Sequence, residues 1–217
     1  MKEEIKWIDW AKFFGIFLVI LGHVLQRVPG WNDCEIINLW DWIYLFHMPL
    51  FFVLSGYLYK QSSNPGYRKI FYALIIPYLL YQLLYMPLWN WKALYAEEGA
   101  TLFFGKHILG ILMGDGYETP YSLYSCLPCW FIVSIIQLRL IFYFIKINRT
   151  STLILMAGSV LFLYLRKSLG FDLYCCLDST IMAIPYYLAG YWLKVTDGFG
   201  KLKPLLLGGV KIHYPIV

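Results

Sequence analysis

Charged residues are scarce in this 217-residue sequence: Asp, Glu, Lys and Arg together make up 14% of it, whereas a soluble domain has about 25%. Hydrophobic residues reach 60% and the mean hydropathy is +0.59. This balance excludes a soluble core. Several apolar runs approach the length of about 20 residues that crosses a bilayer. The sequence therefore predicts an all-α, polytopic transmembrane helical bundle with about six to eight membrane segments.

Other signals are missing as well. No small-residue cleavage site follows the first apolar run, so we expect that run to be retained. The five cysteines include one isolated CxxC, Cys126 to Cys129, and no repeated spacing, so neither a disulfide framework nor a metal site is expected. The net charge of +5 is spread between the apolar runs, which argues against a nucleic-acid partner. The two halves do not echo each other, as the repeats of many transporters do.

The first apolar stretch, Trp7 to Gln26, carries two ionisable residues, Lys12 and His23. They are eleven positions apart, so they share one face of a helix at a separation of roughly 16 Å. Ionisable groups inside a spanning helix are costly and often functional. The alternative is that Lys12 extends to the headgroups and His23 is an ordinary bundle residue. Asp9 lies one turn before Lys12, where the two can form an ion pair.

Basic residues predict the topology. Lys2 and Lys6 precede the first span, and Lys60, Arg68 and Lys69 crowd a short loop, so we expect the N-terminus in the cytoplasm. Residues 101–113 form a short apolar segment, expected to be interfacial or re-entrant. A last segment, 204–217, begins and stops early, so we expect one C-terminally incomplete domain, residues 1–217. The predicted spans are 10–26, 42–59, 70–88, 127–147, 151–165 and 180–193.

The second span contains His47 and runs in the opposite direction to the first, so we expect it at the depth of His23. Lys12, Arg68 and Lys69 are predicted on the inner side. A neutral imidazole suits a general base acting on an alcohol, and Lys and Arg suit phosphates. This map suggests a phosphorylated donor from the cytoplasm and an acceptor hydroxyl on the far side. Arg139, inside a later span, either extends to the headgroups or contacts the donor phosphates.

Two stretches carry a specific resemblance: IDWAKFFGIFLVILGH, which ends at His23, and LFHMPLFFVLSGYLYK, which contains His47. Weaker matches surround Pro77, Trp130 and Gly190. The sequence resembles the integral membrane acyltransferase family 3, in its fucose 4-O-acetylase-like branch. The resemblance implies a bacterial cytoplasmic-membrane enzyme without a permanently bound cofactor. It would transfer an acyl group, usually acetyl from acetyl-CoA, to a sugar hydroxyl of an extracytoplasmic glycan.

The resemblance also implies roles for single residues. His23 corresponds to the catalytic histidine, Lys12 to a basic residue near the path of the donor, and His47 to a partner or structural residue. Arg68 and Lys69 fall near a basic pair of the family at a different spacing. We expect His23 to act as general base in a direct transfer. An acyl-histidine intermediate remains open, and the alternative functions are a membrane transporter or an inactive fragment.

Overall fold

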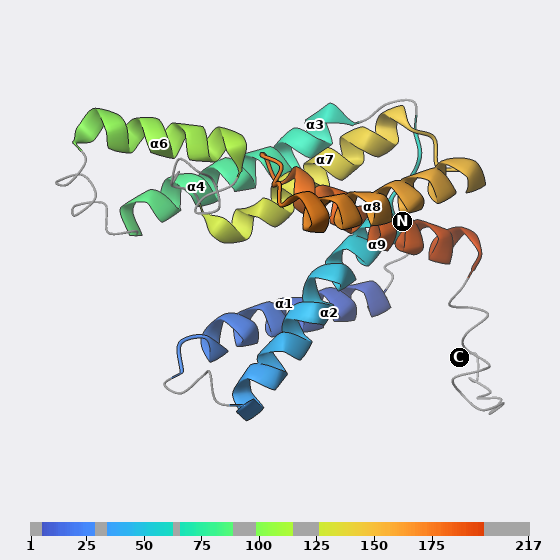
Figure 1. Cartoon of the computed structure of the whole chain (residues 1–217), viewed down its shortest axis with the longest axis horizontal. Coiled ribbons are helices and arrows are strands. Elements are labelled where there is room, and N and C mark those ends of the chain that lie inside the picture. The colour runs from blue at the N-terminus through green and yellow to red at the C-terminus, as the bar shows by residue number, and fades with distance from the viewer. Residues whose placement is uncertain (1–5, 29–33, 63–65, 89–98, 115–125, 198–217) are drawn as a thin grey trace, which may run out of the picture. The chain divides into compact units, whose positions relative to one another are not determined.

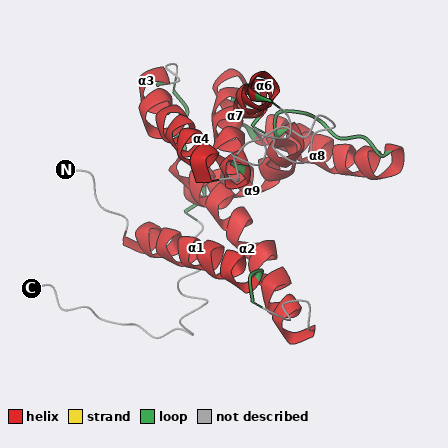
Figure 2. Cartoon of the chain, turned by 90° about the vertical axis from the view of Figure 1, so that its left-hand side faces the viewer, coloured by secondary structure: helices red, strands yellow, loops and turns green. Residues whose placement is uncertain are grey.

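The computed structural model describes residues 6–28, 34–62, 66–88, 99–114 and 126–197. Within these ranges every regular element is a helix, and Figure 2 shows no strand among them. The chain divides into two units, residues 1–59 with 186–217 and residues 60–185, and each is described by itself. The elements in chain order are α1 (Lys6–Leu25), α2 (Cys34–Leu58), α3 (Tyr67–Ile70), the π-helical turn η1 (Phe71–Ile75), α4 (Ile76–Leu88), α6 (Ala100–Met113), the 3₁₀ turn η2 (Leu127–Cys129), α7 (Trp130–Phe144), α8 (Arg149–Leu169) and α9 (Leu177–Val195), as Figure 1 shows.

Helices α1 and α2 lie side by side in the first unit (Figure 1). The buried positions of α1, Ile8, Gly15 and Gly22, follow one another at intervals of seven residues. A Cβ added at Gly15 would lie 2.7 Å from Cζ of Phe51, and one at Gly22 would lie 2.9 Å from Cε2 of Tyr44. The two glycines therefore admit aromatic rings of α2 close to the backbone of α1, a common device for packing helices in lipid.

Helix α2 also packs against α9, whose residues from Tyr186 onward belong to the same unit. A Cβ added at Gly56 would lie 1.9 Å from the carbonyl oxygen of Tyr187, and one at Gly190 would lie 1.9 Å from that of Val53. The backbones touch directly at this crossing, so only glycine fits at either position. Near the end of α2, Nζ of Lys194 donates a hydrogen bond of 3.1 Å to the carbonyl oxygen of Tyr59.

In the second unit, α3, η1 and α4 follow one another without a break from Tyr67 to Leu88. Pro77 has no N–H and cannot donate an α-helical hydrogen bond to the carbonyl oxygen of Ala73, which lies inside the π-turn. The interruption of the α-helix takes the form of a π-turn. On α4, Tyr78 donates a hydrogen bond of 2.5 Å to the carbonyl oxygen of Ile111 in α6.

Helix α8 has well-defined ends. Asn148 and Ser151 form a reciprocal capping box at its start, and Gly170 ends it in the left-handed conformation with φ of 65°. Close to that end, Arg166 forms ion pairs with Asp172 at 2.6 Å and with Asp178 at 3.2 Å. The positive charge of Arg166, which the predicted topology places on the outer side, is thus compensated by two carboxylates.

Three helical segments of the described ranges are long and apolar enough to cross a membrane: Trp7–Leu25, Asn38–Leu58 and Arg149–Leu169. The protein is therefore a membrane protein, and the all-α prediction is confirmed for the described residues. Helices α6 and α7, with 14 and 15 residues, are shorter. The number of six to eight membrane segments stays a prediction.

Some helix boundaries differ from the predicted ones. Helix α2 begins at Cys34, eight residues before the predicted start at residue 42, because residues 34–41, which lie outside the predicted span, are helical. Helix α7 covers Trp130–Phe144 of the predicted range 127–147, and α8 extends beyond 151–165 at both ends. The segment 204–217 lies outside the described residues.

Candidate active site

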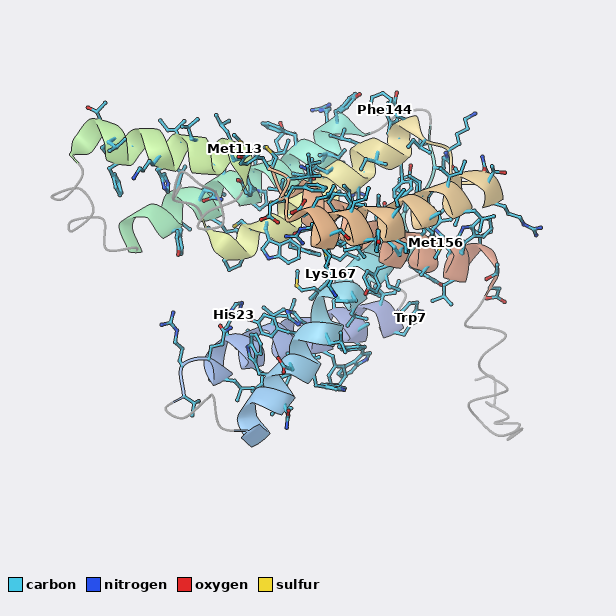
Figure 3. The ribbon with its side chains drawn as sticks, in the orientation of Figure 1. Trp7, His23, Met113, Phe144, Met156 and Lys167 are labelled. Atoms are coloured by element: carbon cyan, nitrogen blue, oxygen red, sulfur yellow. The ribbon has the colours of Figure 1, made fainter. Side chains whose placement is uncertain are left out.

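Helix α1 positions Lys12 and His23 three turns apart, and Figure 3 shows Trp7 and His23 near its opposite ends. Nζ of Lys12 forms an ion pair of 3.3 Å with Oδ1 of Asp9, which confirms the local pair that the spacing predicts. The side chain of Lys12 is about half-exposed and that of Asp9 is exposed, and such a pair contributes little in water. Lys12 is therefore not committed to a buried partner among the described residues and can exchange Asp9 for another anion.

His23 is exposed, and its Nδ1 lies 3.4 Å from the hydroxyl oxygen of Tyr44 on α2. The two rings meet edge to face at a centroid distance of 6.2 Å. This approach depends on Gly22, the residue before His23, because any larger side chain there would meet the Tyr44 ring. The sequence of α1 thus places the histidine and the space for its aromatic neighbour side by side.

His47 is 3% exposed and lies one turn after Tyr44 on α2. Its Nδ1 is 2.6 Å from the carbonyl oxygen of Ile43. A carbonyl only accepts hydrogen bonds, so Nδ1 carries the proton, and the lone pair of the neutral ring is on Nε2. The ring of His47 meets that of Tyr44 edge to face at 4.9 Å. The structure therefore brings His23 and His47 against the same tyrosine ring.

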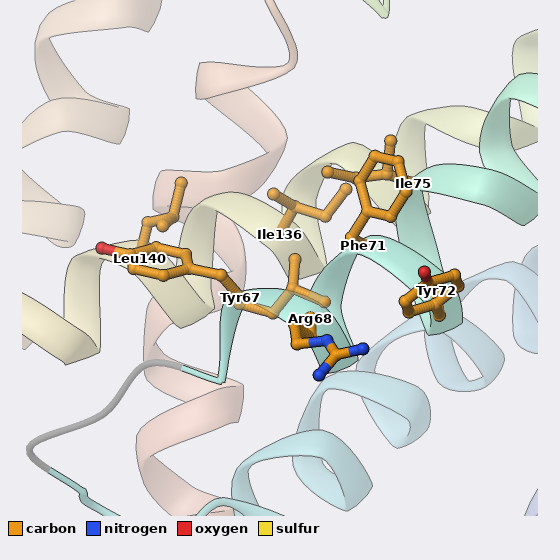
Figure 4. Close-up of a pocket in the computed structure, with 8 residues that line it drawn as sticks. Tyr67, Arg68, Phe71, Tyr72, Ile75, Ile136 and Leu140 are labelled. Atoms are coloured by element: carbon orange, nitrogen blue, oxygen red, sulfur yellow. The ribbon is translucent and has the colours of Figure 1, made fainter.

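A groove of about 510 Å³ lies in the second unit. Arg68 lies at its edge, next to Tyr67, while apolar side chains of η1 and α7 fill most of its lining (Figure 4). The π-turn widens this part of the helix, and such turns often occur at functional sites. The lining residues are Tyr67, Arg68, Ile70, Phe71, Tyr72, Ile75, Ile136 and Leu140.

The other predicted cations of this unit are Lys69, next to Arg68 on α3, and Arg139, on α7. Neither lines the groove. None of the three charged side-chain groups forms an ion pair or a hydrogen bond with another described residue. Their charges are therefore available to an anion. Lys12 and the two histidines belong to the first unit, and these three cations to the second.

The cysteines of the isolated CxxC precede α7. Cys126, Cys129, Cys175 and Cys176 are free thiols. The Cys129 thiol donates a hydrogen bond to Cys126 and thereby lowers the pKa of the Cys126 thiol. No group of three potential metal ligands gathers among the described residues.

The family model described as "Acyltransferase domain" matches residues 5–210, which is most of the chain. The chain belongs to acyltransferase family 3. Two relatives of the chain are both named nodulation protein NolL. That of Mesorhizobium japonicum is 32% identical over 158 residues, and that of Sinorhizobium fredii is 37% identical over 111.

These matches cover 70% and 49% of this chain but only 39% and 28% of the two relatives. The chain therefore spans well under half of their length. No solved structure matches the chain. The family assignment agrees with the resemblance carried by the stretches around His23 and His47. The catalytic and donor-binding roles of individual residues stay predictions.

Sequence reasoning missed Tyr44 of this chain. The signal for it is local: Tyr44 precedes His47 by three residues, a spacing that places both on one face of a helix. What the sequence alone could not show is that the same ring also contacts His23, which lies 21 residues earlier in the chain. That contact depends on the packing of α1 against α2.

Proposed function

We propose that the protein is an O-acyltransferase that moves an acetyl group from acetyl-CoA to a hydroxyl of an extracytoplasmic or cell-surface glycan. The family assignment supports acyl transfer. The observation that carries the proposal is the pair of histidines around Tyr44 on two helices long enough to span a membrane. An imidazole at such a place can take the proton of an alcohol.

In this mechanism His23 is the general base. As the acceptor oxygen attacks the thioester carbon, its proton passes to the imidazole; the carbon–sulfur bond then breaks, and the proton leaves with the thiolate. His23 returns to its neutral form, so the acceptor gains an ester and the donor becomes a free thiol. His47, whose Nδ1 is fixed by Ile43, has a structural role in this site.

Cations bind the donor in this proposal. The 3′-phosphate and diphosphate of acetyl-CoA are anions, and guanidinium and ammonium groups are their usual partners. Lys12, Arg68, Lys69 and Arg139 have charges that no buried carboxylate among the described residues compensates. We propose that they contact the donor from the cytoplasmic side of the inner membrane, with the N-terminus also in the cytoplasm.

A labelled-acetyl assay tests the proposal. Membranes containing the protein are incubated with acetyl-CoA labelled in the acetyl group, and covalent label in glycan is measured. His23→Ala should lower the transfer rate at least about a hundredfold, the usual range for a general base. Val24→Ala, at an exposed neighbouring position of α1, is the matched control and should keep the wild-type rate.

Equal amounts of each variant in the membrane fraction exclude an insertion defect. Transfer by His23→Ala at the wild-type rate would refute the role of His23. A transporter, by contrast, would leave no covalent label in any glycan.

A further inference from the structure

Tyr44 is held in place on three sides. On its own helix, the Trp40 ring packs at a centroid distance of 4.2 Å, and the His47 ring meets it at 4.9 Å. Across the helix pair, its Cε2 occupies the space beside Gly22. The ring is half-buried, and these contacts limit its orientations. Its hydroxyl oxygen lies 3.4 Å from Nδ1 of His23.

Each of the two histidines has an oxygen atom close to its Nδ1. Nδ1 of His47 faces the carbonyl oxygen of Ile43, and Nδ1 of His23 faces the phenolic oxygen of Tyr44. The Tyr44 hydroxyl is the hydrogen-bond partner of His23 within the described residues. A carbonyl partner fixes the proton on Nδ1, whereas a hydroxyl group can accept from this nitrogen or donate to it. A base that takes a proton through Nε2 needs its proton on Nδ1.

We propose that Tyr44 is a positioning residue for the transfer reaction: its phenolic oxygen accepts the Nδ1–H bond of His23 and keeps the Nε2 lone pair free for the acceptor hydroxyl. The inference rests on the proposed function, since it presumes that His23 is the base. It adds a residue to the site besides His23 and His47, the two histidines of the stretches that resemble the family.

The proton balance of the step is simple. Nε2 of His23 takes the acceptor proton while the oxygen–carbon bond forms, and it gives that proton to the leaving thiolate when the carbon–sulfur bond breaks. The Nδ1–H bond to Tyr44 persists throughout. Tyr44 itself neither gains nor loses a proton, and its oxygen faces the positive charge while the ring is an imidazolium.

Tyr44→Phe tests the proposal because it removes the hydroxyl and keeps the ring, with its contacts to Trp40, His47 and Gly22. The expected result is a kcat about tenfold lower, the lower range for losing a hydrogen bond to a group that becomes charged. The KM values for acetyl-CoA and for the acceptor should stay within about twofold. Tyr164→Phe is the matched control, since Tyr164 is 68% exposed on α8 and should keep the wild-type kcat.

A second measurement separates positioning from structure. In protein labelled with ¹⁵N-histidine, the nitrogen spectrum of neutral His23 should report a proton on Nδ1 in the wild type. In Tyr44→Phe the proton should shift towards Nε2. His47 is the internal control, since its Nδ1 stays bonded to Ile43 in both proteins. The thermal unfolding midpoint should be the same for Tyr44→Phe and the wild type.

Three results would overturn the inference alone: a wild-type kcat in Tyr44→Phe, a raised KM with kcat unchanged, or an unchanged tautomer of His23. In each of these cases, an inactive His23→Ala in the same membranes would still uphold the proposed function. If His23→Ala keeps the wild-type rate, His23 is not the base, and the inference fails together with the proposed mechanism.

Discussion

The α1–α2 pair and the groove between α3–η1 and α7 use their charged and polar groups in opposite ways. Along α1 and α2, both imidazoles have a partner at Nδ1 and a common aromatic neighbour. At the groove, Arg68 and its neighbouring cation Lys69 form no ion pair with a described residue. Groups that move a proton work best when they are already oriented. Groups that bind an anion can stay without an ion pair until the ligand supplies the opposite charge.

The comparison also extends to packing. The first unit brings backbones together at glycines, so its geometry leaves little freedom. The groove is lined mainly by apolar side chains and has no such backbone contact at a glycine. We therefore expect substitutions in the first unit to act on folding and turnover, and substitutions at the groove to act on the affinity for the donor.

The largest expected effect is on stability, at the crossing of α2 and α9. Gly56→Ala would place a Cβ 1.9 Å from a backbone oxygen of Tyr187, so the helices must move apart. Overpacking of this kind costs about 3 kcal/mol or more where backbone atoms cannot yield. The measurement is the thermal unfolding midpoint in detergent, which should fall markedly.

Gly158→Ala is the matched control for Gly56→Ala, because a Cβ at Gly158 on α8 meets no atom within 4 Å. Replacing an interior helical glycine by alanine should there be neutral or stabilising by up to about 1 kcal/mol. Equal midpoints for the two variants would contradict the difference between a closely packed crossing and an open helix face.

Arg68→Gln tests the groove and should have an intermediate effect. Loss of a charged hydrogen bond to phosphate costs about 1.5 kcal/mol or more, so the KM for acetyl-CoA should rise about tenfold with kcat nearly unchanged. Lys60→Gln, an exposed position just after α2, controls for the loss of one positive charge. A lower kcat with an unchanged KM would place Arg68 in catalysis instead.

The smallest expected effect concerns Cys126, and it tests whether the second unit also contains an oriented pair. The hydrogen bond from Cys129 lowers the pKa of the Cys126 thiol from its ordinary value of 9.0, which enlarges its thiolate fraction at neutral pH. Cys129→Ala should therefore slow the alkylation of Cys126 by iodoacetamide a few-fold at pH 7. Above the ordinary pKa the difference should vanish, because the thiol ionises in both proteins.

Mass spectrometry of the labelled peptide measures the rate of Cys126 alkylation. Cys175→Ala serves as the control, since the thiol of this cysteine contacts Met113. Slower alkylation of Cys126 at both pH values would show that Cys129→Ala changed access to the thiol rather than its ionisation.

Local patterns predicted much of the first unit. Side chains three or four positions apart on one helix are neighbours, and this spacing predicts correctly that Lys12 pairs with Asp9. Opposite helix directions placed His23 and His47 at one level, and both lie against the same ring. Tyr44 itself could not be singled out, because its contact with His23 depends on how deeply a ring enters beside Gly22.

The second unit was harder to predict because its contacts join residues far apart in the chain. The backbone N–H of Cys126 donates to Oε1 of Gln82, 44 residues earlier. Hydropathy gives the approximate extent of a span but cannot predict such a hydrogen bond. This hydrogen bond helps to fix where η2 and α7 begin. Hydropathy also placed the start of α2 too late, because a helix continues past the apolar region whenever its polar turns remain hydrogen-bonded.

The π-turn η1 has a further consequence for helix geometry. A turn with one residue in excess shifts the rotational phase of everything after it by about 100° relative to an uninterrupted α-helix. Arg68 lies before this phase shift, and Tyr78 and Gln82 lie after it. Deleting one residue from Phe71–Ile75 would restore the regular helix but turn Arg68 away from its present direction relative to them. The position of a single extra residue thus decides which way the basic end of this helix faces.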